Sequence, residues 1–298
     1  MSVFTMDADW LVFDPTPSRP TFVVPAGSVD AHCHVFGPGD RFPYAAERKY
    51  TPCDASKDQL FALRDFLGFE KNVIVQATCH GTDNRAMLDA LVSANGDARG
   101  VATVDSDVSH DELAAMHDVG VRGVRFNYMR RLVDPEPDEY YHRIVERIAP
   151  FGWHVVIYFE AADLAERWKF FTSLETAVVV DHMGRPDVTQ SVDGPAFAQF
   201  LALMDEHENF WCKVTCPERV SVSGPPHYSD FVPFARRVTE SFPERVLWGT
   251  DWPHPNMRDY MPDDGAAVDF IPRIAPTQDL QRKLLVDNPM RLYWRDDA

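Results

Sequence analysis

Two kinds of segment alternate along this chain, and their alternation restricts the fold more than any other feature. Short runs rich in valine, isoleucine and other apolar residues recur, and stretches with helical spacing of apolar residues lie between most of them. Such alternation predicts parallel strands joined by helices. The predicted strands are residues 29–34, 72–78, 100–105, 121–127, 153–159, 177–182, 210–215 and 245–251. The predicted helices are residues 57–69, 84–94, 110–119, 138–148, 195–207 and 277–285.

Eight strands separated by helices fit a (β/α)8 barrel, an α/β fold that commonly takes about 250 residues. The chain has 298 residues. A doubly wound parallel sheet is the alternative, but no G-x-G-x-x-G follows an early predicted strand. Residues 1–27 contain four prolines and no sustained period, so we expect an N-terminal extension laid over the surface. The barrel should then occupy residues 28–298 as a single domain.

The chain is acidic, with a formal net charge of −17. It therefore lacks the basic surface that binding to nucleic acid or to anionic membranes would need. We find no signal-peptide pattern and no stretch apolar enough to span a membrane. Five cysteines, an odd number without a C-x-x-C pair, favour reduced thiols over a disulfide framework. We expect a cytoplasmic monomer or small homo-oligomer that acts on a small molecule.

Polar side chains end the predicted strands. In a (β/α)8 barrel the active site lies at the carboxyl ends of the strands. A polar group placed there after an apolar run costs free energy unless it is paired or used, so their convergence predicts an active site. These residues are His32 and His34, Gln76 and Thr78, Asp105, Arg125 and Asn127, Tyr158 and Glu160, Asp181 and His182, Lys213 and Thr215, and Thr250 and Asp251.

The first predicted strand carries Asp30, His32 and His34 on one face, because side chains alternate along a strand. His32 and His34, together with His182 and Asp251, form the core of a candidate hydrolase site. In one interpretation Asp251 is a general base for water while the imidazoles stabilise an oxyanion. In another, the same side chains hold a mononuclear zinc ion. Core histidines and a turn aspartate are the remaining, purely structural alternative.

Arginines also follow the strands, at Arg125, Arg131, Arg185 and Arg219. A guanidinium group can grip a carboxylate with two hydrogen bonds. The cluster therefore predicts a small substrate with more than one carboxylate, although solvated arginines that balance nearby acids are the alternative. At most one of the neighbours Arg130 and Arg131 needs to point inward. Further candidates for the pocket are Tyr50, Thr78, His80, Tyr158 and Asn256.

Several long strings in the chain resemble barrels of the amidohydrolase superfamily, and within it the family of pyrone-dicarboxylate lactone hydrolases. The similarity runs from about Pro25 to Trp294. The resemblance implies a lactonase that works without divalent metal in the bacterial breakdown of lignin-derived aromatics, through protocatechuate 4,5-cleavage. The strings are VDAHCHVFGP (29–38), NVIVQATCHGTDN (72–84), WHVVIYFE (153–160), DHMGRPD (181–187), WGTDWPHPNM (248–257) and NPMRLY (288–293).

The resemblance implies a role for each candidate residue. Thr78 stands where the family has a serine, which keeps the hydroxyl group. The fourth strand supplies Arg125 rather than a bridging lysine, and the fifth supplies Tyr158 rather than a histidine. A binuclear metal centre therefore lacks ligands, and no cofactor is expected. The matched residues are Asp251 as the base; His32, His34 and His182 as groups that polarise the carbonyl; Arg125, Arg131, Arg185 and Arg219 as contacts to the substrate carboxylates; and Tyr50, Thr78, Tyr158 and Asn256 as further pocket residues.

Three other functions stay open at this point. One is a metal-dependent hydrolase of a related anionic lactone, such as a sulfomuconolactone, and another is a metal-dependent decarboxylase of the same superfamily. The metal content of the protein would separate these two from a metal-free lactonase. The third is a non-catalytic binder of aromatic dicarboxylates, which an appended DNA-binding or dimerising module would favour, and the sequence shows no such module.

Overall fold

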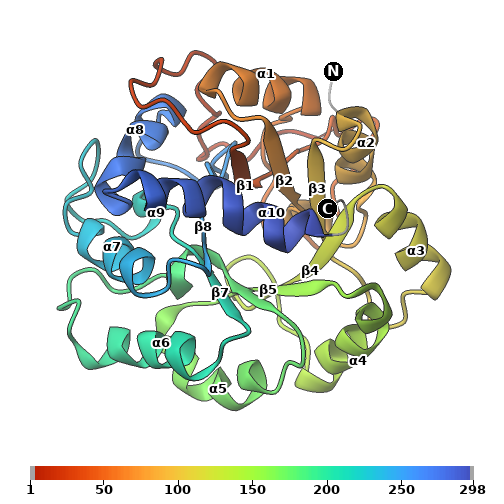
Figure 1. The fold of residues 1–298 in the computed structure, drawn as a ribbon. Helices are drawn as coiled ribbons and strands as arrows, with labels where there is room; N and C mark the ends of the chain where they lie inside the picture. Colours follow the sequence, from red (N-terminus) through yellow and green to blue (C-terminus); the bar gives the residue numbers. More distant parts are fainter. Residues whose placement is uncertain (1–3, 296–298) are drawn as a thin grey trace.

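The computed structural model describes residues 4–295, and they form a (β/α)8 barrel (Figure 1). Eight parallel strands pair in chain order around the barrel. This confirms the predicted fold, and the alternative of a doubly wound sheet is wrong, because such a sheet reverses its strand order at a switch point. The strands are β1 (Val29–Cys33), β2 (Lys71–Val75), β3 (Ala98–Ala102), β4 (Val121–Asn127), β5 (His154–Tyr158), β6 (Val178–Val180), β7 (Phe210–Lys213) and β8 (Val246–Leu247).

The segment that follows β8 closes the barrel against β1. The amide of Ala31 donates a hydrogen bond to the Trp248 carbonyl over 2.9 Å, and the amide of Asp251 donates to the His32 carbonyl over 2.8 Å. Gly249 lies between them, and a Cβ atom at this position would come within 2.2 Å of the His32 amide nitrogen. Only a residue without a side chain allows the two backbones to approach this closely.

The helices cover the outside of the barrel, and their apolar faces pack on the strands. Five of the six predicted helices are confirmed to within a few residues, and the prediction for residues 277–285 corresponds to α9 and a π-helix. The pattern does not predict α5, α7, α8 or α10; α8 contains Gly265 and Pro272, which normally interrupt a helix. The helices are α1 (Lys57–Leu67), α2 (Arg85–Ala94), α3 (His110–Asp118), α4 (Asp138–Ile148), α5 (Leu164–Thr172), α6 (Pro195–Glu206), α7 (Val232–Ser241), α8 (Asp264–Ile274), α9 (Gln278–Arg282) and α10 (Asn288–Tyr293), with the π-helix at Lys283–Asp287. Short 3-10 turns occupy Thr78–His80, Ala149–Phe151, Ala161–Asp163, Asp181–Gly184 and Pro217–Arg219.

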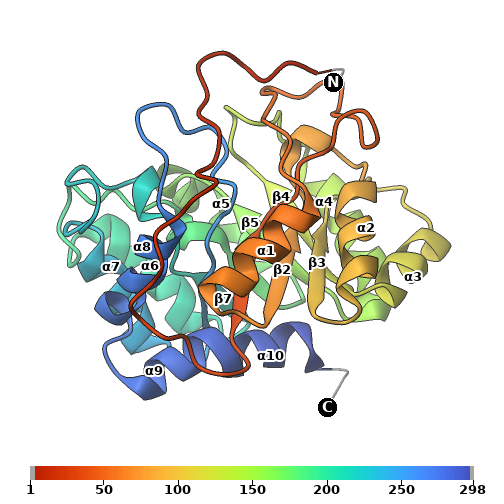
Figure 2. The same cartoon turned by 90° about the horizontal axis from the view of Figure 1, so that it is seen from above.

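The two ends of the barrel differ. Helices α9 and α10 lie across one end (Figures 1 and 2), where Tyr293 joins the buried cluster inside the strands. Loops rise from the other end (Figure 2), which holds the carboxyl ends of the strands. Residues 4–27 contain no helix or strand and run along the outside of the barrel, where Leu11 and Thr21 hydrogen-bond to Met257 and Asp269.

Two properties of the chain bear on its class. Within residues 4–295, no helix combines the length and the apolar character needed to cross a lipid bilayer. All five cysteines lie in the described part of the chain and are free thiols, as the sequence predicts.

The close approach at Gly249 leads to a prediction about stability. Gly249→Ala should reduce the free energy of unfolding by about 3 kcal/mol, because the added methyl group must push the β1 backbone away. At Gly96 a Cβ atom meets nothing within 4 Å, although φ is +100°. Gly96→Ala should therefore cost only the backbone strain of about 1–2 kcal/mol. Urea denaturation measures both, and a Gly249→Ala variant no less stable than Gly96→Ala would contradict the account of barrel closure.

Candidate active site

The carboxyl ends of the strands surround a small, narrow pocket. A larger, mostly apolar cavity lies beside α6, but the ionisable side chains converge on the smaller one. The structure therefore brings together residues that the sequence spreads over 200 positions and more. The predicted site residues that line this pocket are His34, Tyr50, Thr78, Arg125, Arg131, Tyr158, His182, Arg219, Asp251 and Asn256.

Asp251 lies at the centre of the polar contacts. Its Oδ1 atom is 3.4 Å from His32 Nε2 and 3.2 Å from His34 Nε2, and its Oδ2 atom accepts a hydrogen bond of 2.6 Å from Arg219 Nη2. Burial alone would raise the pKa of Asp251, but the Arg219 charge and the His32 contact outweigh it and hold the pKa well below its usual range. Asp251 is therefore ionised at neutral pH and ready to accept a proton.

The backbone around Asp251 is fixed by the first strand. Asp251 has a left-handed φ of +64°, a conformation that costs a non-glycine residue free energy and is common at functional sites. The Asp30 carboxylate accepts hydrogen bonds from the Thr250 amide over 3.0 Å and from its hydroxyl over 2.8 Å. These bonds hold the strained segment in place, so Asp30 supports the site without lining the pocket.

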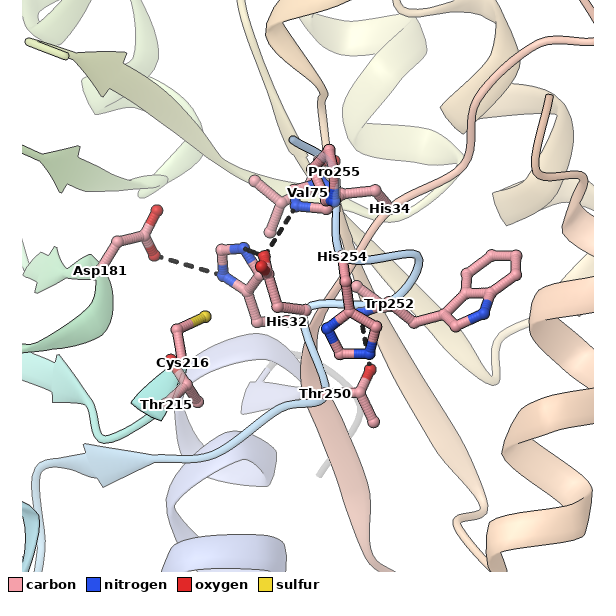
Figure 3. A network of polar contacts seen from close by, with 12 residues as sticks. His32, His34, Val75, Asp181, Thr215, Cys216, Thr250, Trp252, His254 and Pro255 are labelled. Carbon is pink, nitrogen blue, oxygen red and sulfur yellow. Dashed lines mark hydrogen bonds and ion pairs between the residues drawn. The ribbon is translucent and has the colours of Figure 1, made fainter. Parts of the chain in front are cut away.

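His32 lies beneath the pocket rather than in its wall, and it is fully buried. Its Nδ1 atom is 2.8 Å from the Lys213 ammonium nitrogen. The same atom is 3.3 Å from Asp181 Oδ1, a contact drawn in Figure 3. The sequence placed Lys213 and Asp181 at strand ends but gave them no role. Since an ammonium group only donates hydrogen bonds, His32 Nδ1 accepts one, and the ring proton lies on Nε2.

His34 and His182 are neutral at neutral pH. Burial lowers the pKa of His34 to about 4, although its contact with Asp251 works in the opposite direction. Burial likewise holds the pKa of His182 well below its usual range. His34 Nδ1 donates to the Val75 carbonyl over 2.8 Å, which leaves an unprotonated Nε2 facing Asp251. His182 Nδ1 is 2.6 Å from the Thr215 hydroxyl. A hydrogen-bonding role therefore suits these two imidazoles better than a cationic one.

The four predicted arginines gather at this end of the barrel, but each already has a protein partner. Arg125 contacts Asp181 Oδ2 through Nε and Nη2, over 2.9 and 2.8 Å. Arg185 lies just outside the pocket lining and donates from Nε to Glu160 over 3.0 Å. Arg131 is exposed at the mouth, 3.4 Å from the Tyr158 hydroxyl, while its neighbour Arg130 is exposed and lies outside the pocket lining. The Arg219 contact with Asp251 was not foreseen from the sequence.

Among the remaining candidates, Tyr50 and Thr78 place their hydroxyl oxygens 3.5 Å apart in the pocket wall. Asn256 Oδ1 is buried and has no hydrogen-bond partner within residues 4–295, so it could accept a bond from a ligand. His80 lies outside the pocket lining, where its ring nitrogens contact the Gly37 amide and the Pro43 carbonyl. His80 is thus a structural residue.

Several side chains here have the donor atoms of a metal site. His32, His34 and Asp251 offer three atoms that lie within 4.8 Å of one another, and two imidazoles with a carboxylate are a common zinc set. The contacts around them fit a metal poorly. His32 carries its proton on the nitrogen that would have to coordinate, and the Arg219 guanidinium already neutralises Asp251.

Comparison with known proteins gives a consistent result. The family model for amidohydrolases matches residues 29–295. The chain is 65% identical to a 2-pyrone-4,6-dicarboxylate hydrolase from Comamonas testosteroni, with all of both chains covered. It is 36% identical to a 4-sulfomuconolactone hydrolase from Hydrogenophaga intermedia, over 91% of this chain and 90% of that one. A solved structure, described as a putative 2-pyrone-4,6-dicarboxylic acid hydrolase from Pseudomonas putida, is 32% identical with a TM-score of 0.76, covering 91% of this chain and 98% of that one.

Proposed function

The chain belongs to the amidohydrolase family, and we propose that it is a lactonase that hydrolyses 2-pyrone-4,6-dicarboxylate to 4-oxalomesaconate, reversibly. The observation that carries the proposal is the meeting of one ionised carboxylate, Asp251, with imidazoles and arginines in a single small pocket. A base beside hydrogen-bond donors suits attack of water on an ester, and the arginines suit a substrate with two carboxylates. The full-length identity of 65% to a hydrolase of this substrate supports the same conclusion.

In the proposed reaction Asp251 takes a proton from water while the water oxygen attacks the lactone carbonyl carbon. The ring carbon–oxygen bond then breaks, and the leaving oxygen receives the proton as the enol of 4-oxalomesaconate. The new carboxyl group ionises, so that one proton is released for each ring opened. The reverse sequence closes the ring again.

A carboxylate with a depressed pKa is a weak base, and His34 can assist it. His34 Nε2 is unprotonated and lies 3.2 Å from Asp251 Oδ1, so a proton taken from water can be shared between the two atoms. The carbonyl oxygen gains negative charge at the same moment. His32, His34 and His182 then stabilise it: His32 donates from Nε2, and His34 donates once it has received its share of the proton.

The arginines would hold the two substrate carboxylates and orient the ring toward the water. Arg131 and Arg185 both approach the Tyr158 hydroxyl, over 3.4 and 3.5 Å, and so define one side of the pocket. Arg125 lies over the Tyr158 ring, 4.8 Å from its centre. Arg125, Arg185 and Arg219 are each paired with a carboxylate. Arg131 contacts the Tyr158 hydroxyl and has no carboxylate partner within residues 4–295, so its charge at the pocket mouth is the one that would attract a dianion.

We propose that catalysis needs no metal, because the His32 tautomer and the Arg219 contact both oppose coordination at Asp251. A metal-dependent hydrolase of a related anionic lactone is the second candidate, which the 36% identity to a sulfomuconolactone hydrolase favours. We further propose that the protein is a cytoplasmic enzyme of aromatic catabolism that acts as a monomer or small homo-oligomer. The free thiols are consistent with a reducing compartment, and the acidic charge argues against nucleic-acid and membrane partners.

The first prediction concerns the base. Asp251→Asn keeps the shape of the side chain but removes the proton acceptor, so kcat should fall by at least ~10²-fold. The loss of pyrone absorbance measures turnover. Asp134, whose side chain is 92% exposed, provides the control, and Asp134→Asn should leave turnover unchanged. A folded Asp251→Asn variant with normal kcat would remove Asp251 from the reaction.

The second prediction separates two arginines by their effect on pH dependence. Arg219 lowers the pKa of Asp251, so Arg219→Met should raise that pKa and move the acid limb of kcat/KM to higher pH. Arg185 contacts Glu160 rather than Asp251, and Arg185→Met should leave the acid limb in place. Both variants should weaken dicarboxylate binding by about 1.5–3 kcal/mol. If Arg219→Met leaves the acid limb unmoved, Arg219 does not set the pKa of the base.

The third prediction concerns metal. Dialysis against a chelator should leave the rate of pyrone hydrolysis unchanged, and active enzyme should contain well below one equivalent of zinc or manganese. Elemental analysis and assays before and after dialysis measure this. Activity that is lost with a stoichiometric metal and restored by its return would instead favour the metal-dependent alternative, and 4-sulfomuconolactone should then be tested as the substrate.

A further inference from the structure

We propose that Lys213 is a positioning residue that decides which ring nitrogen of His32 carries the proton. Lys213 ends β7, beneath the pocket, and is fully buried. It touches neither the pocket nor the proposed reacting atoms, and it acts only through His32. The kinetic part of this inference rests on the proposed function, whereas the protonation state of His32 does not.

The contacts of Lys213 determine the direction of the hydrogen bond. Its Nζ atom lies 2.8 Å from His32 Nδ1 and 3.1 Å from Asp181 Oδ1. Burial lowers the pKa of Lys213, but the contact with the Asp181 carboxylate opposes this effect and favours the charged ammonium form, which has three donors and no acceptor. His32 Nδ1 must therefore accept. The proton that remains lies on Nε2, which is buried, has no hydrogen-bond partner within residues 4–295 and lies 3.4 Å from Asp251 Oδ1. It is a donor available to the site.

Asp181 would produce the opposite result if Lys213 were absent. Its Oδ1 atom lies 3.3 Å from His32 Nδ1, and an ionised carboxylate only accepts hydrogen bonds. Burial alone would raise the pKa of Asp181, but Lys213 and Arg125 hold it well below its usual range. Without the ammonium group, Asp181 would draw the ring proton to Nδ1 and leave Nε2 bare. The two groups compete for one nitrogen, and Lys213 lies closer.

This competition also decides whether the donor atoms form a metal site. A histidine that binds a metal usually donates its other ring proton to a carboxylate, a backbone carbonyl or water, and Asp181 alone would provide the carboxylate for His32. His34 Nε2 and Asp251 Oδ1 complete the set, within 4.8 Å of each other and of the third donor atom, from His32. Lys213 thus maintains a hydrogen-bond donor at the position where zinc would need a lone pair.

The wild-type protein itself gives the first test. Two-dimensional NMR of histidine labelled with nitrogen-15 identifies the protonated nitrogen, and the His32 signals are assigned by their loss in His32→Gln. We expect the proton on Nε2 in the wild type and on Nδ1 in Lys213→Met. A wild-type His32 protonated on Nδ1 or on both nitrogens overturns the proposal. So does a folded Lys213→Met protein with an unchanged tautomer.

Kinetics give the second test. Lys213→Met should lower kcat for pyrone hydrolysis by at least ~10-fold, with KM within about twofold, because the substrate contacts remain. Adding Asp181→Asn should restore part of kcat, since the amide can donate to His32 Nδ1 and return the proton to Nε2. A purely structural role for Lys213 predicts a double variant worse than the single one, and that result overturns the proposal. Failure of every protein, wild type included, to hydrolyse the pyrone would count against the proposed function alone, since the NMR result stands apart from it.

Two controls complete the design. His154 is buried in the same barrel and has an unpaired Nε2 atom within residues 4–295, but no hydrogen bond joins it to His32. His154→Gln should lower stability while kcat and the His32 tautomer stay unchanged. Zinc titration by calorimetry adds a readout without substrate. Lys213→Met should bind zinc ~10-fold or more tightly than the wild type, and His32→Gln in that background should abolish the gain. Equal zinc affinity in the wild type and Lys213→Met would contradict the inference that Lys213 prevents His32 from binding zinc.

Discussion

Two carboxylates remain ionised in the middle of this barrel because three cations lie against them. Asp181 contacts Lys213 and Arg125, and Asp251 contacts Arg219, and both carboxylates are almost fully buried. An unpaired charge in such a place would cost several kilocalories per mole. The pairs therefore make a charged active site compatible with an apolar barrel, and removing one partner would expose the other to the full cost of burial.

The fold supplies these partners from opposite sides. Arg125 lies two residues before the end of β4, Asp181 follows β6, Lys213 ends β7 and Asp251 follows β8, so only a closed barrel brings them together. Closure depends on the narrow contact at Gly249, which also carries Asp251 to its place over His32. Stability and function thus share the same few backbone contacts. The left-handed conformation of Asp251 fits this pattern, since strain of that kind persists only where the surroundings enforce it.

Protons, as much as side chains, distinguish the possible chemistries of the site. Two imidazoles and a carboxylate can hold zinc or can act on water directly. At His34 the Val75 carbonyl fixes the proton on Nδ1, and at His32 Lys213 fixes it on Nε2. One ring therefore offers an acceptor and the other a donor, which suits proton transfer better than coordination. Val75 and Lys213, which determine where these two protons lie, are both outside the pocket lining.

The sequence alone determined the barrel, since the eight apolar runs and their polar ends follow from local pattern, and it placed His34, His182 and Asp251 at the end where the pocket forms. It did not indicate α8, because Gly265 and Pro272 hide its helical pattern. Only the tertiary structure placed His32 beneath the pocket and Arg219 against Asp251. It also placed Lys213 against the His32 ring, which is 181 positions away in the chain. The physical reason is that pairing between distant residues depends on distances of a few ångströms across a closed barrel, and the periodicity of a sequence carries no information about such distances.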